Sequence, residues 1–204
     1  MQFDIYISML EKMRDKTRDD LYKNLIDLGI DCELSKRGIR ADKLQNPWHR
    51  KSLGVIKINS SYPIEFINII KKDRSKDSPP RWWYYFAIPT DLVKSISDSI
   101  EVKSIRKKTF PIFGKVKSVE WKHNALSQNL ASQFTQDSDI NSLAINIGNV
   151  KIESIDKDFS GYTFSGFTIE IERKNWKDWG NNRKVSLDIH QWNTLNKMAD
   201  ICLN

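Results

Sequence analysis

The chain has 204 residues, of which 33 are basic and 26 acidic, so its formal net charge is +7. Hydrophobic residues make up 39% of it, and seven Trp, six Tyr and nine Phe supply bulky side chains for a core, which excludes disorder over most of the chain. No window approaches about 18 consecutive apolar residues, so a membrane-spanning helix and a membrane-embedded role are not expected.

The N-terminal residues and the cysteines indicate the cellular compartment. The N-terminus has neither a basic segment nor a long apolar segment, so no secretory signal is expected. Cys32 and Cys202 are too few for a disulfide scaffold and fit a reducing compartment, which predicts a cytoplasmic protein. The three histidines lie far apart, without a second ligand at zinc-binding spacing, so neither a metal nor another cofactor is expected.

Local patterns in the first part of the chain predict a helix followed by strands. Apolar residues at helical spacing predict an amphipathic helix over residues 3–28, and a short extended stretch follows at residues 30–34. The period then changes to about two, and residues 53–58 and 64–70 are predicted to form a β-hairpin. Residues 71–81 contain no apolar side chain except two prolines, which predicts an exposed loop.

The rest of the chain is predicted to contain five further strands and two helices. The predicted strands are residues 82–88, 102–105, 116–119, 149–155 and 162–173, and the predicted helices are residues 124–134 and a C-terminal helix from about Asp188. Consecutive strands without intervening helices predict an α+β fold with a mixed, mainly antiparallel sheet, flanked by an N-terminal and a C-terminal helix. No Gly/Ser-rich linker divides the chain, so residues 1–204 are predicted to form a single domain.

The positive charge is concentrated in the middle of the chain. Residues 71–122 carry 13 basic and 6 acidic side chains, whereas residues 1–70 have a net charge of +2 and residues 123–204 a net charge of −2. Such an asymmetry favours an anionic partner, although a basic face can also serve solubility alone.

The first basic cluster directly precedes four consecutive aromatic residues. Its cations are Lys71, Lys72, Arg74, Lys76 and Arg81. Cations release counterions from phosphates and flat rings stack on unpaired bases, so both requirements of nucleic-acid binding are present. In a strand, Trp82 and Trp83 point to opposite faces. One ring could therefore be a stacking platform, or both could pack in a core.

A second basic cluster, Arg106-Lys107-Lys108, follows the predicted strand at residues 102–105. If the two neighbouring strands form a hairpin, these cations lie at its tip. Together with the first cluster they predict a domain that binds DNA or RNA without catalysis, through cations and Trp82 or Trp83.

Two alternatives remain open. Glu170, Glu172 and Lys174 share one face of a predicted strand, with Asp158 upstream, a pattern typical of Mg²⁺-dependent nucleases in which carboxylates hold the metal and the lysine positions water. The same Glu-x-Lys pattern also arises from cross-strand charge pairs. The other alternative is a binding module for a small anionic ligand or a protein partner, with the aromatic residues forming the pocket.

Overall fold

The structure is a computed structural model that describes residues 15–46, 51–94, 98–109, 114–174 and 185–204. Its helices are α2 (Thr17–Asp27), α3 (Gln128–Gln136), α4 (Ser138–Ile147) and α5 (Ile189–Leu203), with 3₁₀ turns η1 (Arg40–Lys43), η2 (Asp91–Val93) and η3 (Ala125–Ser127). Its strands are β1 (Cys32–Leu34), β2 (Lys51–Ile58), β3 (Phe66–Lys72), β4 (Arg81–Pro89), β5 (Glu101–Lys108), β6 (Val116–His123), β7 (Asn149–Asp158) and β8 (Thr163–Lys174).

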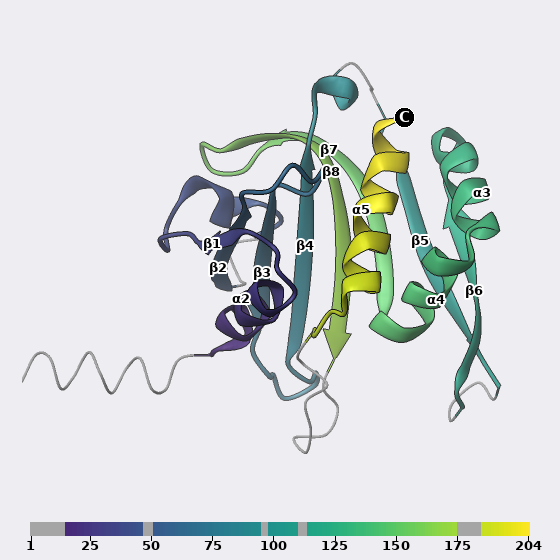
Figure 1. Cartoon of the computed structure of the whole chain (residues 1–204), viewed down its shortest axis with the longest axis horizontal. Helices are drawn as coiled ribbons and strands as arrows, with labels where there is room; N and C mark the ends of the chain where they lie inside the picture. The colour runs from purple at the N-terminus through teal and green to yellow at the C-terminus, as the bar shows by residue number, and fades with distance from the viewer. Residues whose placement is uncertain (1–14, 47–50, 95–97, 110–113, 175–184) are drawn as a thin grey trace, which may run out of the picture.

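The strands form one sheet in the order β1-β2-β3-β4-β8-β7-β5-β6. Strands β1 to β4 follow one another as a meander, and the chain then crosses to the far edge, where β5 and β6 pair (Figure 1). Strands β7 and β8 fill the space between them, and every pairing among the described strands is antiparallel. The predicted α+β class, with helices at both ends of the chain, is confirmed.

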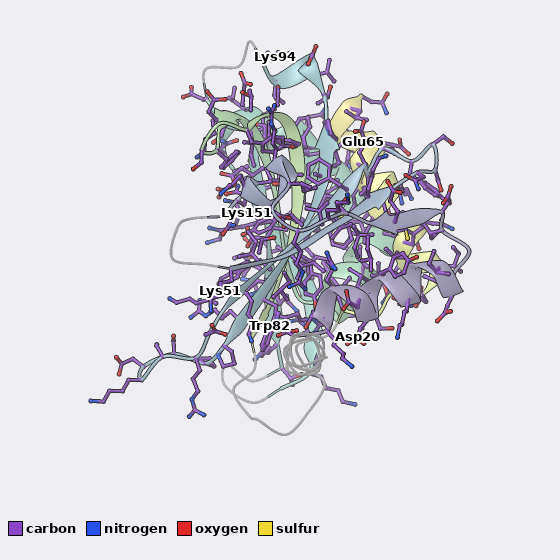
Figure 2. The ribbon with its side chains drawn as sticks, turned by 90° about the vertical axis from the view of Figure 1, so that its left-hand side faces the viewer. Asp20, Lys51, Glu65, Trp82, Lys94 and Lys151 are labelled. Atoms are coloured by element: carbon purple, nitrogen blue, oxygen red, sulfur yellow. The ribbon has the colours of Figure 1, made fainter. Side chains whose placement is uncertain are left out.

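The four α-helices of the described residues cover one face of the sheet. Figure 1 shows them in front of the strands, and the side view in Figure 2 shows α2 and α5 on the same side. The main core lies beneath them, and alternate β4 residues, including Tyr84 and Phe86, point into it. The intervening β4 residues pack in smaller clusters on the opposite face, where Ile70 contacts Trp83 and Tyr85. Strand β4 is therefore buried on both faces.

Several predicted elements are present with shifted ends. The hairpins β2–β3 and β5–β6 and the strands β7 and β8 are confirmed. The N-terminal helix is confirmed for Thr17–Asp27, whereas the predicted residues 3–14 lie outside the described part of the chain. The C-terminal helix begins after Asp188, whose side chain accepts a hydrogen bond from the Gln191 amide in a capping box.

The helix predicted at residues 124–134 forms as the 3₁₀ turn η3 followed by α3, and a further helix, α4, comes directly after it. The break lies at Asp137, which is extended and whose carboxylate accepts the amides of Asp139 and Ile140 at the start of α4. Helix α4 was missed, although Ile140, Leu143, Ala144 and Ile147 form its buried stripe. Of the helices in the described residues, none combines the length and apolar character needed to cross a membrane.

The predicted exposed loop at residues 71–81 is shorter in the structure. Strand β3 continues through Lys72 and β4 begins at Arg81, so these two residues pair across the hairpin and only residues 73–80 connect the strands. Charged residues at strand ends are compatible with the ladder because backbone groups form its hydrogen bonds and the side chains can reach solvent.

Candidate functional site

Strand register brings the two basic clusters to one end of the sheet. Strand β3 ends at Lys72 beside Arg81, Arg81 pairs with Lys174 at the end of β8, and Lys108 pairs with Val116 in the β5–β6 hairpin. Both hairpin turns therefore lie at the lower edge of the sheet in Figure 1. We call this region, comprising Lys51, residues 71–83, residues 106–109 and residues 114–118, the basic end.

At the β3–β4 turn, ion pairs neutralise part of the positive charge. The Lys71 ammonium lies 3.2 Å from Asp15 and 3.1 Å from Asp73, and Lys51 lies 3.6 Å from Asp73. Burial lowers the pKa of Lys71, but the hydrogen bonds that it donates to Asp73 and Asp15 leave this pKa raised. Lys72 and Lys76, in contrast, form no ion pair within the described residues.

At the β5–β6 turn, the three clustered cations have different surroundings. The Lys107 ammonium lies 2.8 Å from Glu120 across the hairpin. Lys108 is exposed and has no ion-pair partner among the described residues. Arg106 points to the helix side instead, where its Nη2 donates a hydrogen bond of 2.6 Å to the Ile145 carbonyl near the end of α4. Only part of this cluster thus faces solvent.

Trp82 and Trp83, one of which was expected to offer a stacking surface, are both buried. Trp82 is 2% exposed in the main core, where its Nε1 donates to Asp15 at 3.4 Å and the Lys71 ammonium lies 5.7 Å from its ring centre. Trp83 is 6% exposed and packs on the opposite face with Ile70 and Tyr85. Because both faces of β4 are covered, neither indole is available for a base in this structure.

A cleft opens at the basic end where the sheet divides. The β5–β7 ladder stops at the pair Lys103–Lys151, and β7 begins only at Asn149, while β5 and β8 both continue. Figure 1 shows β8 and β5 diverging towards the lower edge, with α4 in front of them. The resulting cleft has a volume of about 790 Å³. Its charged lining residues are Lys103, Arg106, Lys108, Lys151, Arg173, Glu170 and Glu172.

Two charged groups of the cleft lining are neutralised by neighbours. The Lys151 ammonium lies 3.0 Å from both Glu101 and Glu153, and the pKa of Lys151 is raised by these carboxylates despite the opposing effect of burial. Glu172 lies 3.4 Å from the Arg81 guanidinium. Both pairs lie on the face of the sheet away from the helices, as strand alternation requires.

Arg106 and Arg173 on the helix side of the cleft are not neutralised in this way. Neither forms an ion pair with a carboxylate among the described residues, and the Nε atom of each is buried without a hydrogen-bond partner. Burial lowers the pKa of both guanidinium groups, and the charge of Arg106 lowers that of Arg173 further, against the opposing effect of Tyr84. Since arginine stays protonated in proteins, the cleft holds two adjacent, incompletely satisfied cations.

Sequence reasoning missed Arg173, Lys103 and Lys151. A signal for Arg173 was present, because it continues the alternation of Ile169 and Ile171 and so occupies a core-facing position of β8. An arginine at such a position requires an explanation, since buried charges are normally paired.

Asp158 lies far from the two glutamates of the nuclease alternative. Asp158 pairs with Thr163 at one end of the β7–β8 hairpin, whereas Glu172 pairs with Asn149 at the other. At about 3.3 Å per residue, this separation is roughly 30 Å. Glu170 and Glu172 share a face, the Lys174 side chain lies outside the described side chains, and no group of three or more metal-ligating residues occurs in the described ranges.

No family model, no curated protein and no solved structure matches this chain.

Proposed function

We propose that this protein binds nucleic acid without catalysis, through phosphate contacts at the basic end of its sheet. One observation carries the proposal: cations from two clusters that are far apart in the sequence lie at the same end of one sheet, where the strands terminate. The two turns are separated by four strand positions, which at about 4.8 Å per strand is at least about 19 Å, because β5 and β8 diverge at this end (Figure 1). That span covers several phosphates along a nucleic-acid backbone.

The contact is proposed to be with the phosphate backbone and not with stacked bases. The described residues of the basic end include two aromatic side chains, Trp82 and Trp83, and both are buried. Within the basic end, Lys72, Lys76 and Lys108, together with the exposed Lys115 and Lys117, are described cations that form no ion pair with another described residue. Phosphate contacts by such lysines carry no sequence information, so we expect binding with little sequence preference and strong salt dependence.

The triple variant Lys72→Ala, Lys76→Ala, Lys108→Ala tests this proposal. We expect oligonucleotide affinity at low salt to fall on the order of tenfold to a hundredfold, because phosphate contacts are lost. The slope of log affinity against log salt concentration should become shallower by about 0.7–0.9 for each lost contact. The measurement is fluorescence anisotropy of a short labelled oligonucleotide over a chloride series. Melting temperature should hardly change, because Lys76 and Lys108 are exposed, Lys72 is half-buried without an ion pair, and surface charges of this kind contribute little to stability.

A matched triple variant removes the same charge elsewhere. Lys23, Lys94 and Lys157 are exposed, and Figure 2 shows Lys94 at the end of the molecule opposite Lys51 and Trp82. Changing these three to alanine should preserve most of the affinity and the salt slope. Equal losses in both variants would mean that net charge, and not the basic end, governs binding, and absence of binding by the parent protein at low salt would refute the proposal.

The Glu172→Gln variant distinguishes binding from the nuclease alternative. Glu172 pairs with Arg81 at the basic end, so removing its charge should leave nucleic-acid affinity unchanged or slightly raised. Neither the parent nor the variant should cleave an oligonucleotide in the presence of Mg²⁺, as followed by gel electrophoresis. Mg²⁺-dependent cleavage by the parent that disappears in Glu172→Gln would replace our proposal with the nuclease.

A further inference from the structure

We propose that the cleft between β5 and β8 is a binding site for a single phosphate group, held by Arg106 and Arg173. This proposal does not depend on nucleic-acid binding at the exposed turns. It concerns a recessed site on the helix side of the sheet, where two guanidinium groups line one cavity of about 790 Å³.

The arrangement of the two arginines favours binding of an anion. Two cations that are partly buried side by side are unfavourable unless a counter-charge is present, and no described carboxylate supplies one. The Ile145 carbonyl accepts one Arg106 bond and thereby orients the guanidinium, but it leaves Nε unsatisfied. An oxyanion offers several acceptors to planar guanidinium groups, whose donors match phosphate geometry.

Ser104 supplies a third polar group at the same place. Its Oγ accepts a 2.8 Å hydrogen bond from the Val150 amide, and its hydroxyl proton can still be donated to an anion. Ser104 and Arg106 are two residues apart on β5 and so share its helix-side face, and Ser104 also lines the cleft.

The backbone at Gly148 makes room for this arrangement. Gly148 has φ of +135°, and a Cβ added there would lie 3.1 Å from the Glu172 carbonyl oxygen and 3.8 Å from Cδ of Arg173. The connection from α4 to β7 therefore lies close against β8, and the Arg173 side chain packs along it. This fixes Arg173 on the wall of the cleft.

The acidic residues of the cleft do not occupy the proposed site. Glu170 and Glu172 alternate with Arg173 along β8 and point to the opposite face of the sheet. Glu172 is paired with Arg81, and Glu170 has an interaction partner as well. Arg106 and Arg173 on the helix side are therefore available to bind an anion.

Calorimetric titration of the full chain with inorganic phosphate at constant ionic strength tests the site. We expect saturable binding of one phosphate, weakened about tenfold or more in Arg106→Gln and in Arg173→Gln, because each loses charge-assisted hydrogen bonds. Arg173→Lys should bind with intermediate affinity, since it keeps the charge but not the planar fork. Arg40→Gln, at an exposed arginine outside the cleft, is the matched control and should bind as the parent does.

Thermal melts separate ligand binding from a purely structural role. Phosphate should raise the melting temperature of the parent and of Arg40→Gln, but not that of Arg173→Gln. Without phosphate, Arg173→Gln should melt at or above the parent temperature, because a repulsive neighbour of Arg106 is removed. Absence of saturable phosphate binding by the parent in the millimolar range, or equal binding by all variants, would overturn the proposal.

The source of the phosphate is distinguished by two oligonucleotides. If the site receives a nucleic-acid end, a 5′-phosphorylated oligonucleotide should bind more tightly than its 5′-hydroxyl counterpart, and Arg173→Gln should abolish the difference. If the site receives a free or small-molecule phosphate, the two oligonucleotides should bind equally while inorganic phosphate still binds. The double variant Lys72→Ala, Lys76→Ala, which keeps Lys108 in the cleft lining, should bind inorganic phosphate as tightly as the parent does.

Discussion

Replacing Trp82 with alanine should lower the free energy of unfolding by about 3–5 kcal/mol. The indole is 2% exposed within the main core, so its removal leaves a large cavity beneath the helices. The hydrogen bond from Nε1 to Asp15 is lost as well. Chemical denaturation followed by circular dichroism measures this change, and Trp82→Phe should lose much less because most of the ring volume is kept.

Trp83→Ala should be destabilising for the same reason, although it lies on the opposite face of β4. At temperatures where each variant is folded, we expect nucleic-acid affinity close to that of the parent, because neither ring reaches the surface. A Trp83→Ala protein that melts like the parent but binds nucleic acid about tenfold more weakly, the size of a lost stacking contact, would contradict this assignment and return the ring to the binding surface.

Substitution of Gly166 by alanine should also cause a large loss, on the order of 3 kcal/mol. Gly166 pairs with Pro89 on β4 and with Ile155 on β7 and has φ of +152°. A Cβ there would lie 2.2 Å from the Ile88 carbonyl oxygen and 2.9 Å from Cα of Pro89, both backbone atoms that cannot move aside without separating the strands.

Gly161→Ala separates the steric effect from backbone strain. Gly161 also has a positive φ, +82°, but no atom lies within 4 Å of its added Cβ. We expect it to lose only about 1–2 kcal/mol, the cost of a left-handed conformation for an L-residue. Equal denaturation midpoints for the two variants would show that the close approach of β8 to β4 does not constrain the sheet.

Local sequence patterns predicted much of the secondary structure. The period-two residues around the β2–β3 and β5–β6 hairpins and the capped helix after Asp188 form as expected. These signals depend on residues close together in the chain, so they can be recognised without knowing which strands or helices pack against the segment. The missed break at Asp137 is also local: its carboxylate caps α4, a signal that the sequence contained.

The candidate site was only partly predictable from the sequence. The cation clusters of the β3–β4 and β5–β6 turns were evident from composition, but their position at one end of the sheet depends on how β7 and β8 insert between β4 and β5. The cleft arises from that insertion. At the basic end β7 starts only at Asn149, whereas the neighbouring strands β5 and β8 extend further towards this end of the sheet. Arg173 becomes a partner of Arg106 only through these pairings.

The sequence by itself determined the alternation of side chains, the excess of positive charge in residues 71–122 and the α+β class. Tertiary structure alone decided that both Trp82 and Trp83 are buried, that Asp158 lies far from Glu172, and that Arg106 and Arg173 share a cleft. The physical reason is that alternation assigns a residue to a face, whereas burial of that face depends on strands and helices from distant parts of the chain. Strand partners are selected by the total burial they achieve, which no local window of sequence contains.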